Sequence, residues 1–349
     1  MSGKAYAKER HLSVVSDGLA ALRSPGAMQR TVHQPMAASP LARRLGLLTL
    51  YLSWGSTYPV MRVALRTMPP LLLLSGRCAV AGVILLVVAR LRGAMMPTLR
   101  QWGTAAVIGG TVLGLGHGLT TWGIQHVEAG VAALLVSMVS VWLAVLSWGL
   151  LGERPTSRTA AGLLVGFVGL AFVATASSSG GGRSGLLAVA ALVASPLAWA
   201  LGSILSRRVE LPTDPIMSTA AQLLACAPML FTVSVVAGEP GRAQAFSGAS
   251  LAAFLYLAVC GYVAGFAVYT WMLQVESITI VGTYAYVNPL VAVALGAVFL
   301  GESLSWAVVI GGVVILAGVA LVVMNRAEET ARIETDQVPA APVVNQRST

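Results

Sequence analysis

The chain carries little charge. Only 10% of its 349 residues are charged, 56% are hydrophobic, and the mean hydropathy is +0.80. A soluble domain has about 25% charged residues, so this composition excludes an ordinary water-facing globule. The net charge of +9 comes from basic residues at the chain ends and between apolar runs, so we expect no nucleic-acid partner. The sequence predicts an integral membrane protein whose surroundings are the lipid bilayer.

The chain also lacks the groups that usually build catalytic, metal or nucleotide centres. The three cysteines, Cys78, Cys226 and Cys260, have no paired spacing, so we expect no disulfide framework, no metal site and no cofactor. There is no Gly-x-x-x-x-Gly-Lys loop, which argues against an ATP-driven pump. No clustered acids or nucleophile–base pair is visible, so we expect a protein that is not an enzyme. A membrane-embedded enzyme acting on a lipid-linked substrate is the main alternative.

Long apolar runs dominate the rest of the sequence. A transmembrane helix needs about 20 predominantly apolar residues. Ten runs meet this requirement: 45–65, 70–91, 103–125, 129–151, 156–176, 185–206, 215–237, 250–273, 278–300 and 304–324. They are apolar on every face and about twice as long as the strands of an outer-membrane barrel. We therefore expect an all-α integral membrane fold with ten transmembrane helices.

Both ends of the chain are polar and show no periodicity. We expect disordered tails over residues 1–44 and 325–349. Of the 22 Lys and Arg residues, 17 fall in segments on the same side of the membrane as the tails, against Arg66, Arg183 and Arg242 on the other side. Basic loops remain in the cytoplasm. The sequence thus predicts a multi-pass plasma-membrane protein with both termini cytoplasmic.

An internal repeat is the most informative feature. Two motifs recur at an offset of 149 positions: Trp122-x-x-Gln125 with Gly152-Glu153, and Trp271-x-x-Gln274 with Gly301-Glu302. They predict two copies of a five-helix unit, at 45–176 and 185–324. Because five is odd, the second copy enters the membrane from the opposite side, and inverted repeats of this kind are typical of secondary transporters. A repeat that only builds a stable bundle is the alternative.

The same regions resemble a known family. The resemblance lies in Trp54-Gly55-Ser56-Thr57-Tyr58, in Leu-Gly-Glu after the fourth and ninth runs, and in the Gly-x-x-x-x-x-x-Gly that follows each. These motifs are similar to the EamA branch of the drug/metabolite transporter superfamily over residues 45–324. The resemblance implies a ten-helix bundle that exports amino acids, related metabolites or drugs. We therefore expect a secondary transporter of a small-molecule solute that works by alternating access through a central polar cavity.

Twelve residues within the runs are candidates for contact with the solute: Trp54, Tyr58, Arg77, His117, Thr121, Gln125, Trp199, Gln222, Tyr262, Tyr269, Tyr286 and Asn288. Trp54 lies too deep in its run for an interfacial belt, so its indole faces either a cavity or the packed core. Tyr286 and Asn288 precede Pro289, which frees a backbone carbonyl near the middle of the membrane. This segment either lines the solute path or forms a packing kink.

Two candidates carry basic groups inside the runs. Arg77 would cost about 2.5–3.5 kcal/mol near the bilayer centre. It either snorkels to the boundary or faces the interior, attracting a substrate carboxylate or satisfying freed carbonyls. His117, Thr121 and Gln125 share one helix face at i, i+4 and i+8. His117 is the one intramembrane group that titrates near neutral pH, and it either carries a proton or is a neutral, satisfied side chain.

A weaker repeat at an offset of 145 positions adds two candidates. It places Trp199 opposite Trp54 and Gln222 opposite Arg77. If the two units enclose one cavity, residues at equivalent positions should approach it from both sides.

Other sequence patterns are compatible with a structural role in the helix bundle. Tyr262, Phe266 and Tyr269 form an aromatic stripe on one helix face, which is either core or binding surface. Glu153 and Glu302 follow a glycine at equivalent turns, where a carboxylate complements the dipole of the next helix. Three Gly-x-x-x-Gly pairs allow close helix contacts, within the bundle or in a homodimer: Gly110/Gly114, Gly162/Gly166 and Gly261/Gly265.

Overall fold

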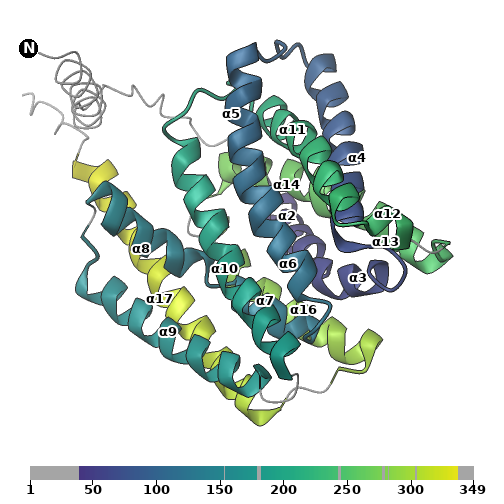
Figure 1. Cartoon of the computed structure of the whole chain (residues 1–349). Helices are drawn as coiled ribbons and strands as arrows, with labels where there is room; N and C mark the ends of the chain where they lie inside the picture. The colour runs from purple at the N-terminus through teal and green to yellow at the C-terminus, as the bar shows by residue number, and fades with distance from the viewer. Residues whose placement is uncertain are drawn as a thin grey trace, which may run out of the picture. The chain divides into compact units, whose positions relative to one another are not determined.

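The computed structural model of the chain describes residues 39–152, 154–178, 182–242, 245–276, 280–281, 283–302 and 305–336. All of the regular secondary structure in these ranges is helical (Figure 1). The first part of the chain forms α2 (Pro40–Gly55), α3 (Thr57–Ala64), α4 (Pro70–Leu91), α5 (Leu99–Gly109), the π-helix η1 (Gly110–His117), α6 (Gly118–Gly123), α7 (Ala129–Val136), α8 (Val139–Leu151) and α9 (Ser157–Ser178).

The second part has a similar order of elements. It forms α10 (Gly182–Ser206), α11 (Pro215–Val236), α12 (Glu239–Arg242), α13 (Gly248–Tyr256), the π-helix η2 (Leu257–Ala264), α14 (Gly265–Val275), α16 (Tyr284–Leu300) and α17 (Trp306–Asp336).

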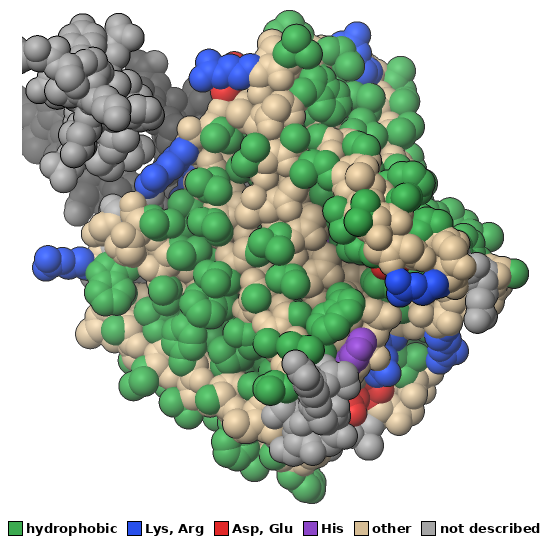
Figure 2. Space-filling model, in the orientation of Figure 1, with side chains coloured by type: hydrophobic (Ala, Val, Ile, Leu, Met, Phe, Trp, Pro, Cys, Tyr) green, Lys and Arg blue, Asp and Glu red, His purple; other side chains and the backbone are tan. Residues whose placement is uncertain are grey.

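The helices are apolar enough for a membrane. Among the described residues, seven helical stretches are long and apolar enough to cross a bilayer, and the 17-residue α16 is apolar but shorter. Figure 2 shows hydrophobic side chains spread across one face of the molecule, with most of the charged side chains toward its margins. These observations confirm an all-helical fold with several candidate membrane spans, and the count of ten spans remains a prediction.

Two helices extend into the predicted tails. α2 begins at Pro40, because the Ser39 side chain accepts a hydrogen bond from the Ala42 amide at 3.2 Å and proline suits the first helical turn. α17 continues to Asp336, whereas the last predicted run ends at 324. The added segment is rich in Ala, Glu and Arg and contains no Gly or Pro, a composition that favours helix. The rest of both predicted tails lies outside the described residues.

Several predicted spans are interrupted rather than uniform. The first divides into α2 and α3 around Ser56, where Pro59 has no N–H to donate back to Gly55. The third and eighth each contain an eight-residue π-helix, η1 and η2. Two side chains of α2 donate to carbonyls in η2: Ser53 Oγ to Cys260 at 2.6 Å and Trp54 Nε1 to Gly261 at 3.1 Å. The irregular backbone therefore has partners inside the protein, as a membrane requires.

Close pairs of helices hold the bundle together. α9 lies along α17, and α4 lies along α11 (Figure 1). A Cβ on Gly162 would lie 3.0 Å from the carbonyl oxygen of Gly318, so the α9–α17 contact depends on the missing side chains. Gly114 and Gly261 likewise face Cys226 and Thr57 of neighbouring helices. These glycines thus serve contacts within the bundle, and the homodimer remains a prediction.

Candidate solute-binding site

A cavity of about 160 Å³, here called the central cavity, lies among α2, α3, α4, η1, α6, α7, α8, α10, η2, α14 and α16. Its polar and aromatic lining comes from both predicted five-helix units. The first unit contributes Trp54, Thr57, Tyr58, Arg77, His117, Thr120 and Ser137, and the second contributes Ser195, Trp199, Tyr262, Phe266, Tyr284 and Asn288. Among the described lining residues there is no Asp or Glu. The cavity can therefore offer aromatic surface, hydroxyls, an amide and a guanidinium.

Aromatic rings form one wall of the central cavity. The Trp54 ring centroid lies 4.9 Å from that of Tyr284 and 5.7 Å from that of Phe266, both in edge-to-face geometry. Tyr269 supports Trp54 from behind, with ring centroids 5.3 Å apart. Since the Trp54 indole N–H is bonded to the Gly261 carbonyl, the ring is fixed and offers its apolar surface to a ligand.

Arg77 is the most unusual residue of the lining. It is only 2% exposed, and its Nε and Nη1 atoms have no hydrogen-bond partner within the described structure. Its Cζ lies 4.6 Å from the centroid of the Tyr262 ring, which is within cation–π range. Such a contact stabilises a desolvated cation by about 2 kcal/mol, less than the cost of about 2.5–3.5 kcal/mol for burying it in a membrane. Snorkelling is excluded by the burial, and freed carbonyls do not satisfy Nε or Nη1.

His117 lies beside Tyr262 at the same cavity. Its Nδ1 is 2.9 Å from the Tyr262 hydroxyl, so one of the two groups donates to the other. Thr121, one turn along, is fully buried and donates its hydroxyl to the His117 carbonyl at 2.7 Å. The structure thus places Thr121 behind His117, as support for the helix, and not in the cavity lining.

Seven of the twelve candidates line the central cavity: Trp54, Tyr58, Arg77, His117, Trp199, Tyr262 and Asn288. The other candidates do not. Besides Thr121 and Tyr269, Gln222 donates to Ser218 Oγ at 3.3 Å within its own helix, and Tyr286 packs against the edge of the hydrophobic core. Gln125 lies beyond the end of α6 at Gly123 and is exposed, so the helix face it was predicted to share with His117 does not reach it.

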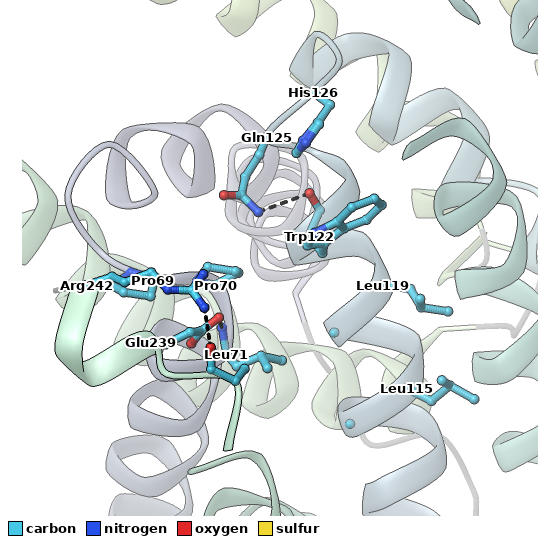
Figure 3. A pocket seen from close by; sticks show the side chains of 13 residues that line it. Pro69, Pro70, Leu71, Leu115, Leu119, Trp122, Gln125, His126, Glu239 and Arg242 are labelled. Carbon is cyan, nitrogen blue, oxygen red and sulfur yellow. Dashed lines mark hydrogen bonds between the residues drawn. The ribbon is translucent and has the colours of Figure 1, made fainter. Parts of the chain in front are cut away.

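Gln125 belongs instead to a second hollow, a groove of about 610 Å³ between the start of α4, α6 and α12. Figure 3 shows Gln125 and His126 at one end, Glu239 and Arg242 across from Trp122, and Leu115 and Leu119 farther along the helix. The Gln125 amide donates to the Trp122 carbonyl at 3.2 Å (Figure 3). This groove has a larger volume than the central cavity, and its lining is mixed polar and apolar.

The cavity also holds small polar residues that sequence reasoning missed. Thr120 Oγ1 and Ser195 Oγ are 2.5 Å apart and join η1–α6 to α10. Thr57 and Ser137 line the cavity as well, together with the larger Tyr284. Small hydroxyl residues are common in membrane helices, so their sequence positions alone do not separate cavity residues from packing residues.

Two buried carboxylates outside the cavity are fully paired. Glu302 accepts hydrogen bonds from the Ala129 amide at 2.9 and 3.0 Å and an ion-paired bond from Arg62 Nη1 at 2.6 Å. Glu239 accepts from the amides of Leu71 and Leu72 at 3.2 and 2.9 Å. Each carboxylate thus caps the start of a helix from the other unit. For Glu302 this helix is α7, so the prediction that Glu302 complements the next helix in the chain is wrong.

Within the described residues, no group of three or more His, Cys, Asp or Glu side chains could hold a metal ion. The chemistry available in the central cavity is therefore binding by ring surfaces, hydrogen bonds and one cation.

Comparison with known proteins fits this arrangement. The chain is 36% identical to the uncharacterized inner membrane transporter YedA of Escherichia coli (strain K12), over 74% of this chain and 83% of the relative. It is 28% identical to the probable terminal-alkyne amino-acid exporter of Streptantibioticus cattleyicolor, over 79% of this chain and 91% of that protein. A protein of known crystal structure shares the fold, with a TM-score of 0.59 and 22% identity over 82% of this chain and 99% of its own.

The family comparison covers both halves. The model of the EamA-like transporter family matches residues 44–175 and again residues 186–324. Together these matches include most of the described helices. The chain therefore belongs to the EamA-like transporter family.

Proposed function

We propose that this chain is a secondary transporter that exports a small organic solute through the central cavity by alternating access. The observation that carries the proposal is the cavity itself. Both predicted five-helix units line it, and it holds buried polar groups inside otherwise apolar helices. Polar groups are costly at membrane depth and mark solute pathways. Family membership and relatives named as transporters support this function and give no support to the alternative of a membrane-embedded enzyme.

Pseudo-symmetric packing supports two inverted repeats over 45–176 and 185–324. α4 packs on α11, α7 on α16 and α9 on α17, so each pair joins a helix with its counterpart five spans later. η1 and η2 occupy corresponding spans, and Gly152 and Gly301 both end helices with positive φ, at 73° and 67°. Two such units can exchange their packings, which would move the opening of the shared cavity from one membrane face to the other.

The proposed orientation has both termini in the cytoplasm of a plasma-membrane protein with ten spans. It rests on the distribution of Lys and Arg between the spans. A reporter domain that is active only in the cytoplasm should be active when it is fused to either end of the chain. A fusion at one end that reports from the outer side would contradict an even number of spans.

Alternating access can be tested without knowing the solute. Ser137 lines the central cavity at the break between α7 and α8. In a chain whose Cys78, Cys226 and Cys260 are replaced by alanine, Ser137→Cys should react with a membrane-impermeant maleimide from outside in intact cells. It should also react from inside in inverted vesicles.

The matched control is Ala144→Cys on α8, the helix that follows Ser137; Ala144 is 2% exposed and does not line the cavity. We expect it to remain unlabelled from both sides. Labelling of Ser137→Cys from one side only would contradict alternating access and favour a fixed binding pocket.

A further inference from the structure

Resting on the proposed transport function, we propose that the solute is a small organic anion. It would carry a carboxylate that pairs with Arg77 and an apolar or aromatic body that fills the remaining cavity. The starting observation is a guanidinium that is 2% exposed, lines the central cavity and keeps two nitrogen atoms without partners in the described structure. Buried cations are ordinarily paired, so this one is built for a partner that arrives from outside.

The protein itself does not supply that partner. The described cavity lining contains no carboxylate, and the buried carboxylates Glu302 and Glu239 are bonded to helix ends elsewhere. The Tyr262 ring contacts the guanidinium through its face, and Nε and Nη1 have no hydrogen-bond partner in the described structure. A carboxylate can accept from such N–H groups, because guanidinium and carboxylate form strong charge-assisted N–H···O bonds.

The same lining discriminates against positive charge on the solute. A cationic solute would approach Arg77 with no counter-ion among the described lining residues, and desolvation of both charges would oppose binding. A zwitterion such as an amino acid gains at Arg77 but leaves its ammonium facing only neutral groups. The cavity therefore favours a net anion over a zwitterion, and a zwitterion over a cation.

The remaining lining residues indicate what kind of solute body fits the cavity. Trp54, Trp199 and Phe266 offer ring surfaces, and the volume of about 160 Å³ limits the solute to a small molecule. Asn288 is 8% exposed, and its Oδ1 has no partner in the described structure. A neutral amide suits an uncharged hydroxyl on the solute. The combination points to a small aromatic or branched carboxylate, with a hydroxy acid as the best match.

Four probes that share a phenyl ring and represent three charge states test the inference. They are 3-phenyllactate and 3-phenylpropionate as anions, phenylalanine as a zwitterion and phenethylamine as a cation. Binding is measured by titration calorimetry on the purified full-length chain in detergent. We expect both anions to bind at least tenfold more tightly than phenylalanine. We expect phenethylamine to bind most weakly of the four. Tighter binding of phenethylamine or phenylalanine than of the anions, or binding of none of the four, would overturn the inference.

Substitution of Arg77 provides the second arm. Arg77→Gln should raise the Kd for 3-phenylpropionate at least tenfold, and Arg77→Lys, which keeps the charge without the planar edge, should raise it less. Arg90→Gln is the matched control, because Arg90 lies at the exposed end of the same helix. Unchanged binding by folded Arg77→Gln would overturn the inference, and the probe series on the unaltered chain decides it if that variant does not fold.

This result is independent of the transport test. Preference for anions together with labelling of Ser137→Cys from one side only would retain the anion site and reject alternating access. Labelling from both sides together with preference for phenethylamine would retain alternating access and reject the anion site.

Discussion

The molecule treats its buried charges in two different ways. At the ends of the helices, Glu302 and Glu239 are each at least three-way bonded, to backbone amides and to Arg62 or Ser234. In the central cavity, Arg77 is as deeply buried, but its Nε and Nη1 have no hydrogen-bond partner in the described structure, and the face of the Tyr262 ring lies beside the guanidinium. Removing one partner of a paired buried charge is strongly destabilising, whereas an unpaired buried charge already costs free energy in the folded state. The comparison thus separates Glu302 and Glu239, which stabilise helix ends, from Arg77, which we propose binds a ligand.

The largest effect on stability should come from Glu302→Gln. The change removes the counter-ion of Arg62 and weakens the cap on α7, and breaking a buried pair of this kind costs about 3 kcal/mol. Denaturant unfolding of the purified protein measures it. Glu128→Gln is the matched control, because Glu128 precedes the same helix but its side chain makes no capping bond. An equal loss in the two variants would show that the Glu302 contacts do not matter.

A smaller loss is expected for Glu239→Gln. This carboxylate caps α4 and accepts a bond from the Ser234 hydroxyl at 2.7 Å. Hydrogen bonds to a charged acceptor are worth about 2 kcal/mol when lost from a buried site. Glu210→Gln serves as the comparison, since Glu210 forms an exposed pair with Arg100 and should contribute less than about 0.5 kcal/mol. If both variants unfold alike, burial of the carboxylate is not what stabilises α4.

Trp54→Phe should have a smaller effect again. It keeps an aromatic ring against Tyr284 but removes the N–H that bonds the Gly261 carbonyl, a loss of about 1 kcal/mol. Trp122→Phe, at an exposed position of α6, should leave the unfolding midpoint unchanged. An unchanged midpoint for Trp54→Phe as well would mean that the π-helical carbonyl has another partner.

The smallest effect on stability is expected for Arg77→Gln. Removing the guanidinium gives up a cation–π contact of about 2 kcal/mol but also a similar or larger burial cost, so the net change should stay within about 1 kcal/mol. The same unfolding titration measures it. A loss as large as that of Glu302→Gln would place Arg77 among the architectural charges.

Sequence patterns located most of the helices and part of the site. Trp54 and Arg77 were recognisable because an indole and a guanidinium are conspicuous in long apolar runs, and both line the cavity. The composition of the runs could not show η1 and η2, because a π-helix needs no distinctive residues. It also could not show that Glu302 caps a helix that begins at Ala129, 173 residues away. Such contacts depend on which helix ends meet, and local propensity does not determine that.

Gln125 illustrates a different limit. Its spacing from His117 places both on one face only if the helix continues, but α6 ends at Gly123. The polar residue then lies in the groove of Figure 3 rather than in the central cavity. Periodicity predicts shared faces well inside a helix and fails at its end, which here lies two residues before the predicted one.

The most direct test measures stability and binding on the same two variants, Arg77→Gln and Glu302→Gln, with 3-phenylpropionate as the ligand. We expect Arg77→Gln to unfold at nearly the same denaturant concentration as the unaltered chain but to lose at least tenfold in affinity. We expect Glu302→Gln to be clearly destabilised yet to bind normally under conditions where it is folded. An Arg77→Gln variant that is destabilised and still binds 3-phenylpropionate would rule out a ligand-binding role for Arg77.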